Sequence, residues 1–184
     1  MAVARRRVAL GLAAAALLAL AACNGASLAP RVHVATLKEL PRPLPLPYDE
    51  TATPADVDAR IDAAFQRAGR TDKRVIVDLG GNWCGWCKAL AAVMDRPEVQ
   101  PFVDANFEVV PVSVSSAQGL TDHNIQVLRR FHIDRIRGVP WLTVADPDGR
   151  VLSSSPEVTD DNHQTPQQMV DWLAKWAKRP AQPG

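Results

Sequence analysis

The sequence predicts an α/β domain with a mixed central sheet flanked by helices. Segments with apolar residues at helical spacing alternate with short runs of β-branched residues, which is typical of strands connected through helices. The last two strand-like runs follow each other across a turn and predict a closing hairpin. With 47% hydrophobic residues among 184, the chain has enough apolar surface to bury one such core.

The first half of the predicted domain contains two helices and a strand. Its first helix follows Thr53 and Pro54, which suit an N-cap and the first helical turn. The run RVIVDL at 74–79 predicts a buried strand, because it is short, apolar and rich in β-branched residues. A second helix is expected over 87–94, and Pro97 ends or kinks it.

The second half continues the alternation and closes the sheet. Strands are predicted at 107–114, 141–146 and 150–155, and helices at 124–133 and 165–179. The complete domain is therefore expected at 53–179, and a proline-rich tail at 180–184 follows it.

Residues 1–22 predict a secretory signal peptide. Three arginines, Arg5 to Arg7, precede an apolar run that is too short for a comfortable membrane span. The run ends in Leu-Ala-Ala-Cys23, which resembles the bacterial lipobox, whose cysteine is lipidated and becomes the mature N-terminus. The alternative is an ordinary signal peptide with an incidental cysteine. We therefore expect an exported lipoprotein on the periplasmic face of a bacterial membrane, and Asn24 favours the outer membrane by similarity.

Residues 23–52 are expected to form the lipidated N-terminus and a proline-rich tether. The stretch PRPLPLPYDE favours extended polyproline II structure and resists packing. The alternative is a segment that wraps the domain surface, with 32–37 as an added edge strand. The net charge of the whole chain is only +1, so no large basic surface indicates a nucleic-acid partner.

Cys84 and Cys87 are the only cysteines left once Cys23 carries lipid, and export places them in an oxidising compartment. A structural zinc site needs four ligands, and the histidines show no paired spacing, so we expect no metal and no other cofactor. A disulfide across two residues closes too small a loop to stabilise the fold much. At a helix N-terminus, however, Cys84 gains thiolate character and Cys87 can resolve a mixed disulfide, so a redox role explains more.

Two segments resemble the thioredoxin family. VIVDLGGNWCGWCK at 75–88 is similar to its active-site segment, and IRGVPWLTV at 136–144 is similar to its cis-proline loop and the following strand. The resemblance implies a thioredoxin fold and thiol–disulfide exchange. It makes Cys84 the attacking thiolate, Cys87 the resolving thiol and Asp78 a buried general base or proton relay for Cys87.

The resemblance also implies a substrate-binding surface on these two loops. Pro140 is expected to be cis, which places the backbone groups of Val139 to pair with an extended substrate. Trp83, Gly85 and Trp86 surround the cysteines and complete the expected substrate-binding set.

Four features depart from the family pattern. Gly-Trp stands between the cysteines and leaves the redox potential open, and Pro111 stands where thioredoxins often have a lysine near the buried acid. Extra residues around 95–124 are expected to form a substrate-specific surface or a longer helix. Trp141 is expected either to shape the substrate groove or to belong to the core.

The combined expectation is a lipid-anchored periplasmic thiol–disulfide oxidoreductase. It reduces disulfides of envelope proteins and receives electrons from a membrane-bound donor. An oxidase or isomerase is the alternative within enzymes. Outside enzymes, the alternative is a redox-regulated or copper-handling binding lipoprotein, for which Met94 is the nearest candidate copper ligand besides the cysteines.

Overall fold

The computed structural model describes residues 29–40, 42–43, 45–114, 123–159 and 165–178. Its centre is a four-stranded sheet in the order β2-β1-β3-β4. The strands are β1 (Arg74–Gly80), β2 (Phe107–Ser113), β3 (Trp141–Ala145) and β4 (Val151–Ser155). β1 pairs parallel with β2 and antiparallel with β3, and β3 pairs antiparallel with β4, which confirms the predicted mixed sheet and closing hairpin.

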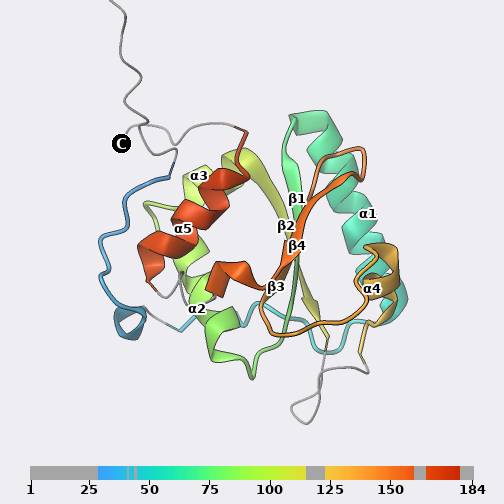
Figure 1. Ribbon diagram of the computed structural model, residues 1–184, viewed down its shortest axis with the longest axis horizontal. Helices are drawn as coiled ribbons and strands as arrows, with labels where there is room; N and C mark the ends of the chain where they lie inside the picture. Colours follow the sequence, from blue (N-terminus) through green and yellow to red (C-terminus); the bar gives the residue numbers. More distant parts are fainter. Residues whose placement is uncertain (1–28, 41, 44, 115–122, 160–164, 179–184) are drawn as a thin grey trace, which may run out of the picture.

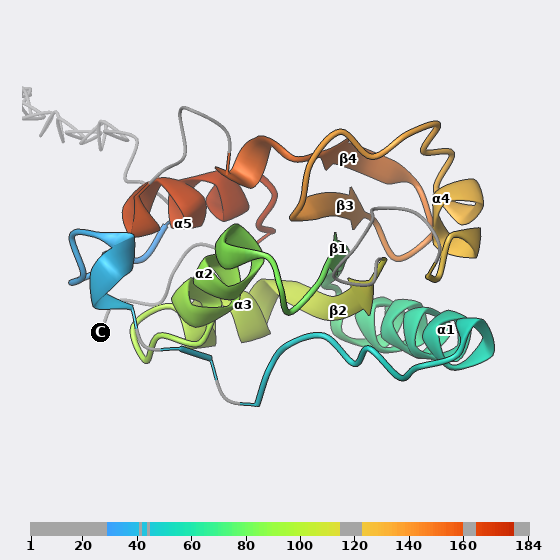
Figure 2. The same ribbon diagram turned by 90° about the horizontal axis from the view of Figure 1, so that it is seen from below.

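Helices cover both faces of the sheet (Figures 1 and 2). One face carries α1 (Pro54–Thr71) and α4 (Gln126–Arg130), and the other carries α2 (Gly85–Met94), α3 (Gln100–Asn106) and α5 (Pro166–Lys175). Short 3-10 helices lie at Leu37–Glu39 and Glu157–Thr159. This three-layer arrangement is the thioredoxin-like fold that the sequence predicts.

The central strand β1 contributes side chains to the apolar clusters on both faces of the sheet. Val75, Val77 and Leu79 pack into the apolar cluster that includes α1 and α4. Ile76 packs into the opposite cluster, with α2, α3 and α5. Because side chains alternate along a strand, Asp78 lies on the same side as Ile76, facing the layer that contains α2.

The N-terminal segment departs from the prediction of a tether that resists packing. Its described part lies against the domain: Ala29 is buried in the core cluster beside α5, and Tyr48 is buried near α2. The N–H of Val32 donates to Oε1 of Gln167 on α5 at 2.9 Å. These residues fit the alternative prediction, in which the segment wraps the domain surface. Residues 32–37, however, do not form the added edge strand. Prolines keep the backbone extended, but the apolar side chains between them still gain by burial.

The extra segment around 95–124 contains a separate short helix rather than a longer α2. Pro97 follows the end of α2 at Met94, and α3 begins three residues later. Pro101 stands in the first turn of α3, where its missing N–H has no helical partner to lose. Residues 115–122 lie outside the described part of the chain.

The predicted signal peptide, Cys23 and the tail at 180–184 also lie outside the described residues. In the part of the chain that the structure describes, no helix combines the length and hydrophobicity needed to cross a bilayer.

Candidate redox site

Cys84 and Cys87 form a disulfide at the N-terminus of α2. Their Cα atoms are 5.3 Å apart, within the ordinary range for a disulfide. Cys84 is the N-cap residue, and its Sγ accepts a hydrogen bond from the N–H of Cys87 at 3.0 Å. The helix start therefore directs an N–H at this sulfur, which stabilises a thiolate there when the pair is reduced. Cys84 is 5% exposed and Cys87 is 0% exposed, so Cys84 is the one that solvent reaches.

Two exposed tryptophans lie beside the cysteine pair in the sequence. Trp83 is 42% exposed and Trp86 is 37% exposed. Gly85 is exposed as well, and the position of its absent Cβ has no heavy atom within 4 Å. All three residues predicted to bind substrate beside the cysteines are thus accessible to a large partner.

The second predicted loop meets the cysteines. The Val139–Pro140 peptide bond is cis, as expected. The carbonyl oxygen of Val139 lies 3.6 Å from Sγ of Cys84, so the two loops form one surface. Trp141, by contrast, is 9% exposed and donates from Nε1 to Oγ of Ser154 at 2.9 Å. It therefore belongs to the core rather than to a substrate groove.

Asp78 lies on β1 and is buried. Its Oδ2 accepts a hydrogen bond from the hydroxyl of Tyr48 at 2.8 Å, while Oδ1 has no hydrogen-bond partner among the described residues. Burial raises the pKa of this carboxyl from 3.8 to about 7, and the hydrogen bond from Tyr48 acts in the opposite direction. Pro111 is the cross-strand partner of Asp78 on β2, so β2 offers no lysine at the position the family pattern suggests.

Tyr48 is a site residue that the sequence analysis missed. It is the only tyrosine in the chain, and burial is the largest of the effects that raise its pKa well above 10. Asn82, in the turn before the cysteines, accepts from the N–H of Tyr48 at 3.2 Å and donates from Nδ2 to its carbonyl at 2.7 Å. A lone aromatic residue among prolines was the available signal, because such a side chain gains by burial.

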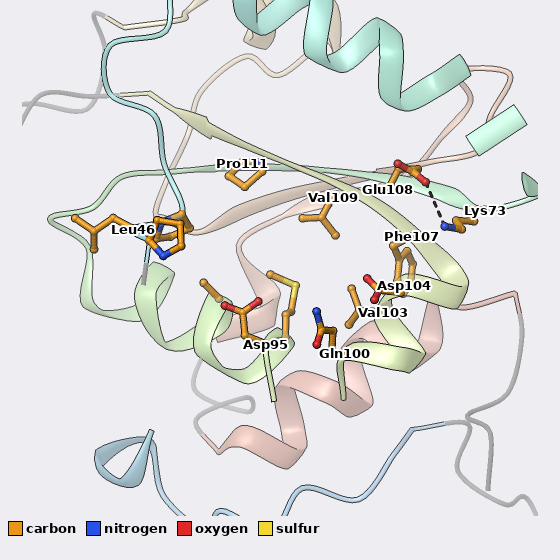
Figure 3. A pocket seen from close by; sticks show the side chains of 14 residues that line it. Leu46, Lys73, Asp95, Gln100, Val103, Asp104, Phe107, Glu108, Val109 and Pro111 are labelled. Atoms are coloured by element: carbon orange, nitrogen blue, oxygen red, sulfur yellow. Dashed lines mark hydrogen bonds and ion pairs between the residues drawn. The ribbon is translucent and has the colours of Figure 1, made fainter. Parts of the chain in front are cut away.

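A cavity of about 530 Å³ lies apart from the cysteines. Segment 45–47, α2, α3 and the edge strand β2 contribute residues that line it, as Figure 3 shows. Its lining combines apolar side chains such as Val103 and Val109 with the carboxylates of Asp95 and Asp104. Neither cysteine lines this cavity, so the chemistry of the disulfide takes place elsewhere.

The family model described as thioredoxin-like matches residues 56–147, half of the chain. The chain belongs to the thioredoxin-like family. The match includes most of α1, then β1, the cysteine pair, β2 and β3, and it begins after Tyr48.

The chain is also similar to solved structures. A disulphide isomerase from Xylella fastidiosa Temecula1 is 27% identical, with a TM-score of 0.62, over 72% of this chain and 98% of its own. An HIV epitope-scaffold protein is 21% identical over 67% of this chain and 74% of its own, but its TM-score of 0.39 is too low to carry a conclusion. A comparison with curated proteins found no match. The fold, the disulfide and the first of these structures indicate thiol–disulfide oxidoreductase chemistry.

In the described part of the chain, no three His, Cys, Asp or Glu side chains lie where they can hold a metal ion. Met94, the candidate copper ligand, is buried and lines the cavity rather than the cysteine surface. Met94 therefore adds no copper ligand to the described surface around the pair.

Proposed function

We propose that this thioredoxin-like protein is a lipid-anchored periplasmic enzyme that reduces disulfides of envelope proteins. The observation that carries the proposal is the disulfide at the N-terminus of α2, with the slightly exposed Cys84 against the cis-proline loop and the buried carboxyl of Asp78 on β1. An attacking thiolate, a site for an extended substrate and a proton acceptor are the parts that thiol–disulfide exchange needs.

The first step joins the reduced enzyme to its substrate. The thiolate of Cys84 attacks one sulfur of the substrate disulfide. A bond forms between Cys84 and that sulfur, while the other substrate sulfur leaves as a thiolate and takes a proton from solvent. The N–H of Cys87 and the start of α2 favour the thiolate that performs this attack.

The second step releases the substrate. Asp78 takes the proton of Cys87, the Cys87 thiolate attacks Cys84, and the bond between Cys84 and the substrate breaks. The substrate leaves as a second thiolate, so its disulfide has gained two electrons and the enzyme carries the Cys84–Cys87 disulfide. A membrane-bound dithiol protein is proposed to return the two electrons, since no second cysteine pair exists in the chain.

Lipid on Cys23 is the proposed means of attachment, with the outer membrane favoured by Asn24. The basic n-region, the apolar run and the Leu-Ala-Ala-Cys23 sequence support it. Mass spectrometry of the mature N-terminus should find a lipidated Cys23, and the Cys23→Ser variant should lack both the lipid and membrane association. An unmodified cysteine in the native protein would reject the anchor without affecting the redox chemistry.

Isomerisation is the second candidate, because the solved relative is described as a disulphide isomerase. Both activities require a reduced pair, since a thiolate must attack the substrate. The redox state of Cys84 and Cys87 in cells, trapped by acid and alkylation, should therefore be mostly dithiol. A pool that is mostly disulfide, and unchanged when the periplasmic supply of reductant is removed, would instead indicate an oxidase. Reactivation of scrambled ribonuclease without added reductant would then separate the isomerase from the reductase.

A further inference from the structure

We propose that Tyr48 is a positioning residue for the release step: its hydroxyl holds one oxygen of Asp78 and leaves the other to accept the proton of Cys87. This inference rests on the proposed exchange reaction. It assigns a function in the redox site to the segment before the thioredoxin-like match, which begins at residue 56.

The two oxygens of the Asp78 carboxyl have different surroundings. Oδ2 accepts from the Tyr48 hydroxyl at 2.8 Å, and Oδ1 is buried without a hydrogen-bond partner among the described residues. A buried polar atom without a partner is costly, and such atoms in native proteins often have a chemical role. The tyrosine fixes the orientation of the carboxyl, so the same oxygen is always available to accept a proton.

Tyr48 and Cys87 meet on one side of Gly80. A Cβ atom on Gly80 would lie 2.5 Å from Oη of Tyr48 and 2.9 Å from Sγ of Cys87. Gly80 follows Asp78 by two positions on β1, so its absent Cβ and the Asp78 side chain face the same side of the sheet. The hydroxyl, the sulfur and the carboxyl therefore share one buried space, which glycine keeps open.

The position of Tyr48 is fixed at its backbone as well. Asn82 forms two hydrogen bonds with the main chain of Tyr48, and the carboxylate of Glu50 accepts from the N–H of Asn82 at 3.1 Å. Asn82 itself lies two residues before Cys84. Segment 48–50 and the turn that leads to the cysteines are thus held together, which keeps the phenol at the carboxyl.

The groups that face Asp78 determine how the pKa of its carboxyl should change when the Tyr48 hydroxyl is removed. The N-terminal segment contributes Tyr48, and α2 contributes Cys87. The two strands paired with β1 contribute Pro111 and Leu142, whose side chains carry no charge. Burial raises the Asp78 pKa and the Tyr48 hydrogen bond lowers it. Removal of the hydroxyl alone therefore leaves burial unopposed and raises the pKa further.

Tyr48→Phe tests this inference, because it removes the hydroxyl and keeps the ring. The release step is followed from about pH 5 to 9 with a peptide disulfide that carries a different fluorophore on each half. In Tyr48→Phe the midpoint of the release profile should move to higher pH, and release near pH 6 should slow about three- to tenfold, since one pKa unit changes the carboxylate fraction about tenfold. Formation of the mixed disulfide should keep its wild-type rate. A profile with an unchanged midpoint would overturn the inference.

Two further measurements separate positioning from a general structural effect. Tyr48 is the only tyrosine, so 3-fluorotyrosine incorporation replaces this side chain alone with a more acidic phenol. This stronger donor should move the release midpoint to lower pH, opposite to Tyr48→Phe, and a shift in the same direction or none would contradict the proposal. The single variant Asp78→Asn and the double variant Asp78→Asn/Tyr48→Phe should show the same release profile, because both lack the carboxyl through which Tyr48 acts.

The outcome can be distinguished from failure of the proposed enzyme function. In oxidised protein with 13C-labelled aspartate, the Asp78 carboxyl resonance is identified by its loss in Asp78→Asn. Its titration midpoint should rise in Tyr48→Phe and fall with 3-fluorotyrosine. An inert wild-type enzyme with these shifts would reject only the reductase proposal. An active wild type whose Asp78 midpoint is the same in all forms would reject only the function assigned to Tyr48.

Discussion

The Tyr48 hydroxyl donates to the Asp78 carboxyl at 2.8 Å, although the two residues are 30 positions apart in the chain. Asp78 lies on the central strand of the thioredoxin-like domain, and Tyr48 lies in the proline-rich segment that precedes it. Both side chains are buried. The cross-strand partner of Asp78 is Pro111, so no lysine at that position stabilises the carboxylate. The carboxyl therefore has a neutral donor, the Tyr48 hydroxyl, as its partner, whereas thioredoxins often have a lysine nearby.

Asp78→Asn should slow release of substrate far more than attack on it. Only release requires Cys87 to lose its proton, and loss of a positioned base costs about a hundredfold or more. The two-fluorophore peptide disulfide measures both steps in one stopped-flow experiment. Equal slowing of both steps would indicate that Asp78 supports the structure rather than the chemistry.

The same variant should change how stability depends on pH. The Asp78 pKa is about 7 in the folded protein against 3.8 for the free side chain, so folding takes up a proton between these values. The stability that this group provides is fully present below about pH 4 and is lost as pH rises through about 7. Asp78→Asn should therefore be more stable than wild type above pH 7, by roughly 2–4 kcal/mol.

Urea denaturation of the oxidised proteins at several pH values measures this difference. The gain from Asp78→Asn should grow between about pH 4 and 7 and stay constant at higher pH. A gain that is the same at all pH values would show that the carboxyl of Asp78 has an ordinary pKa.

Tyr48 should ionise only well above pH 10 in the folded protein. Burial is the main cause, and the Asp78 charge and its hydrogen bond to Tyr48 add to it. Because Tyr48 is the only tyrosine, the phenolate absorbance near 295 nm reports this group alone, with Tyr48→Phe as the blank. In Asp78→Asn the midpoint should fall, since a negative neighbour is removed. An ordinary midpoint in folded wild type would place Tyr48 in solvent.

Gly80→Ala should destabilise the protein, whereas Gly85→Ala should not. A Cβ at Gly80 would overlap Tyr48 Oη and Cys87 Sγ, and overpacking of this kind costs about 1–3 kcal/mol. A Cβ at Gly85 meets no heavy atom within 4 Å, so its effect should stay within about 0.5 kcal/mol. Urea denaturation of both variants makes the comparison. Equal stabilities would mean that the space beside Gly80 is not tightly filled.

The sequence predicts those parts of the site that lie in one continuous segment. Cys84 and Cys87 stand three positions apart between a strand and a helix start, so the local pattern is enough to place them. Asp78 lies on the strand just before them, and the family resemblance supplied its role. Pro140 could be placed only through the family resemblance, because proline by itself rarely indicates a cis bond.

Tyr48 was not predictable in the same way. Prolines precede it, and they specify a local extended backbone but not the surface on which Tyr48 lies. Its partners, Asn82 and Asp78, are 34 and 30 positions away, and one sequence contains no signal for such pairing. α3 was missed for a related reason, since Pro97 and Pro101 resemble helix breakers although Pro101 stands in a first turn, where proline is tolerated.

Reduction of insulin by the Cys84–Cys87 pair is the most direct measurement of thiol–disulfide exchange in this protein. With dithiothreitol as electron source, wild type should precipitate insulin faster than dithiothreitol alone. Cys84→Ser should fall to the background rate, because the attacking sulfur is absent, and Cys87→Ala should accumulate a mixed disulfide with insulin. Wild type at the background rate, or Cys84→Ser at the wild-type rate, would contradict an enzyme that works through this pair.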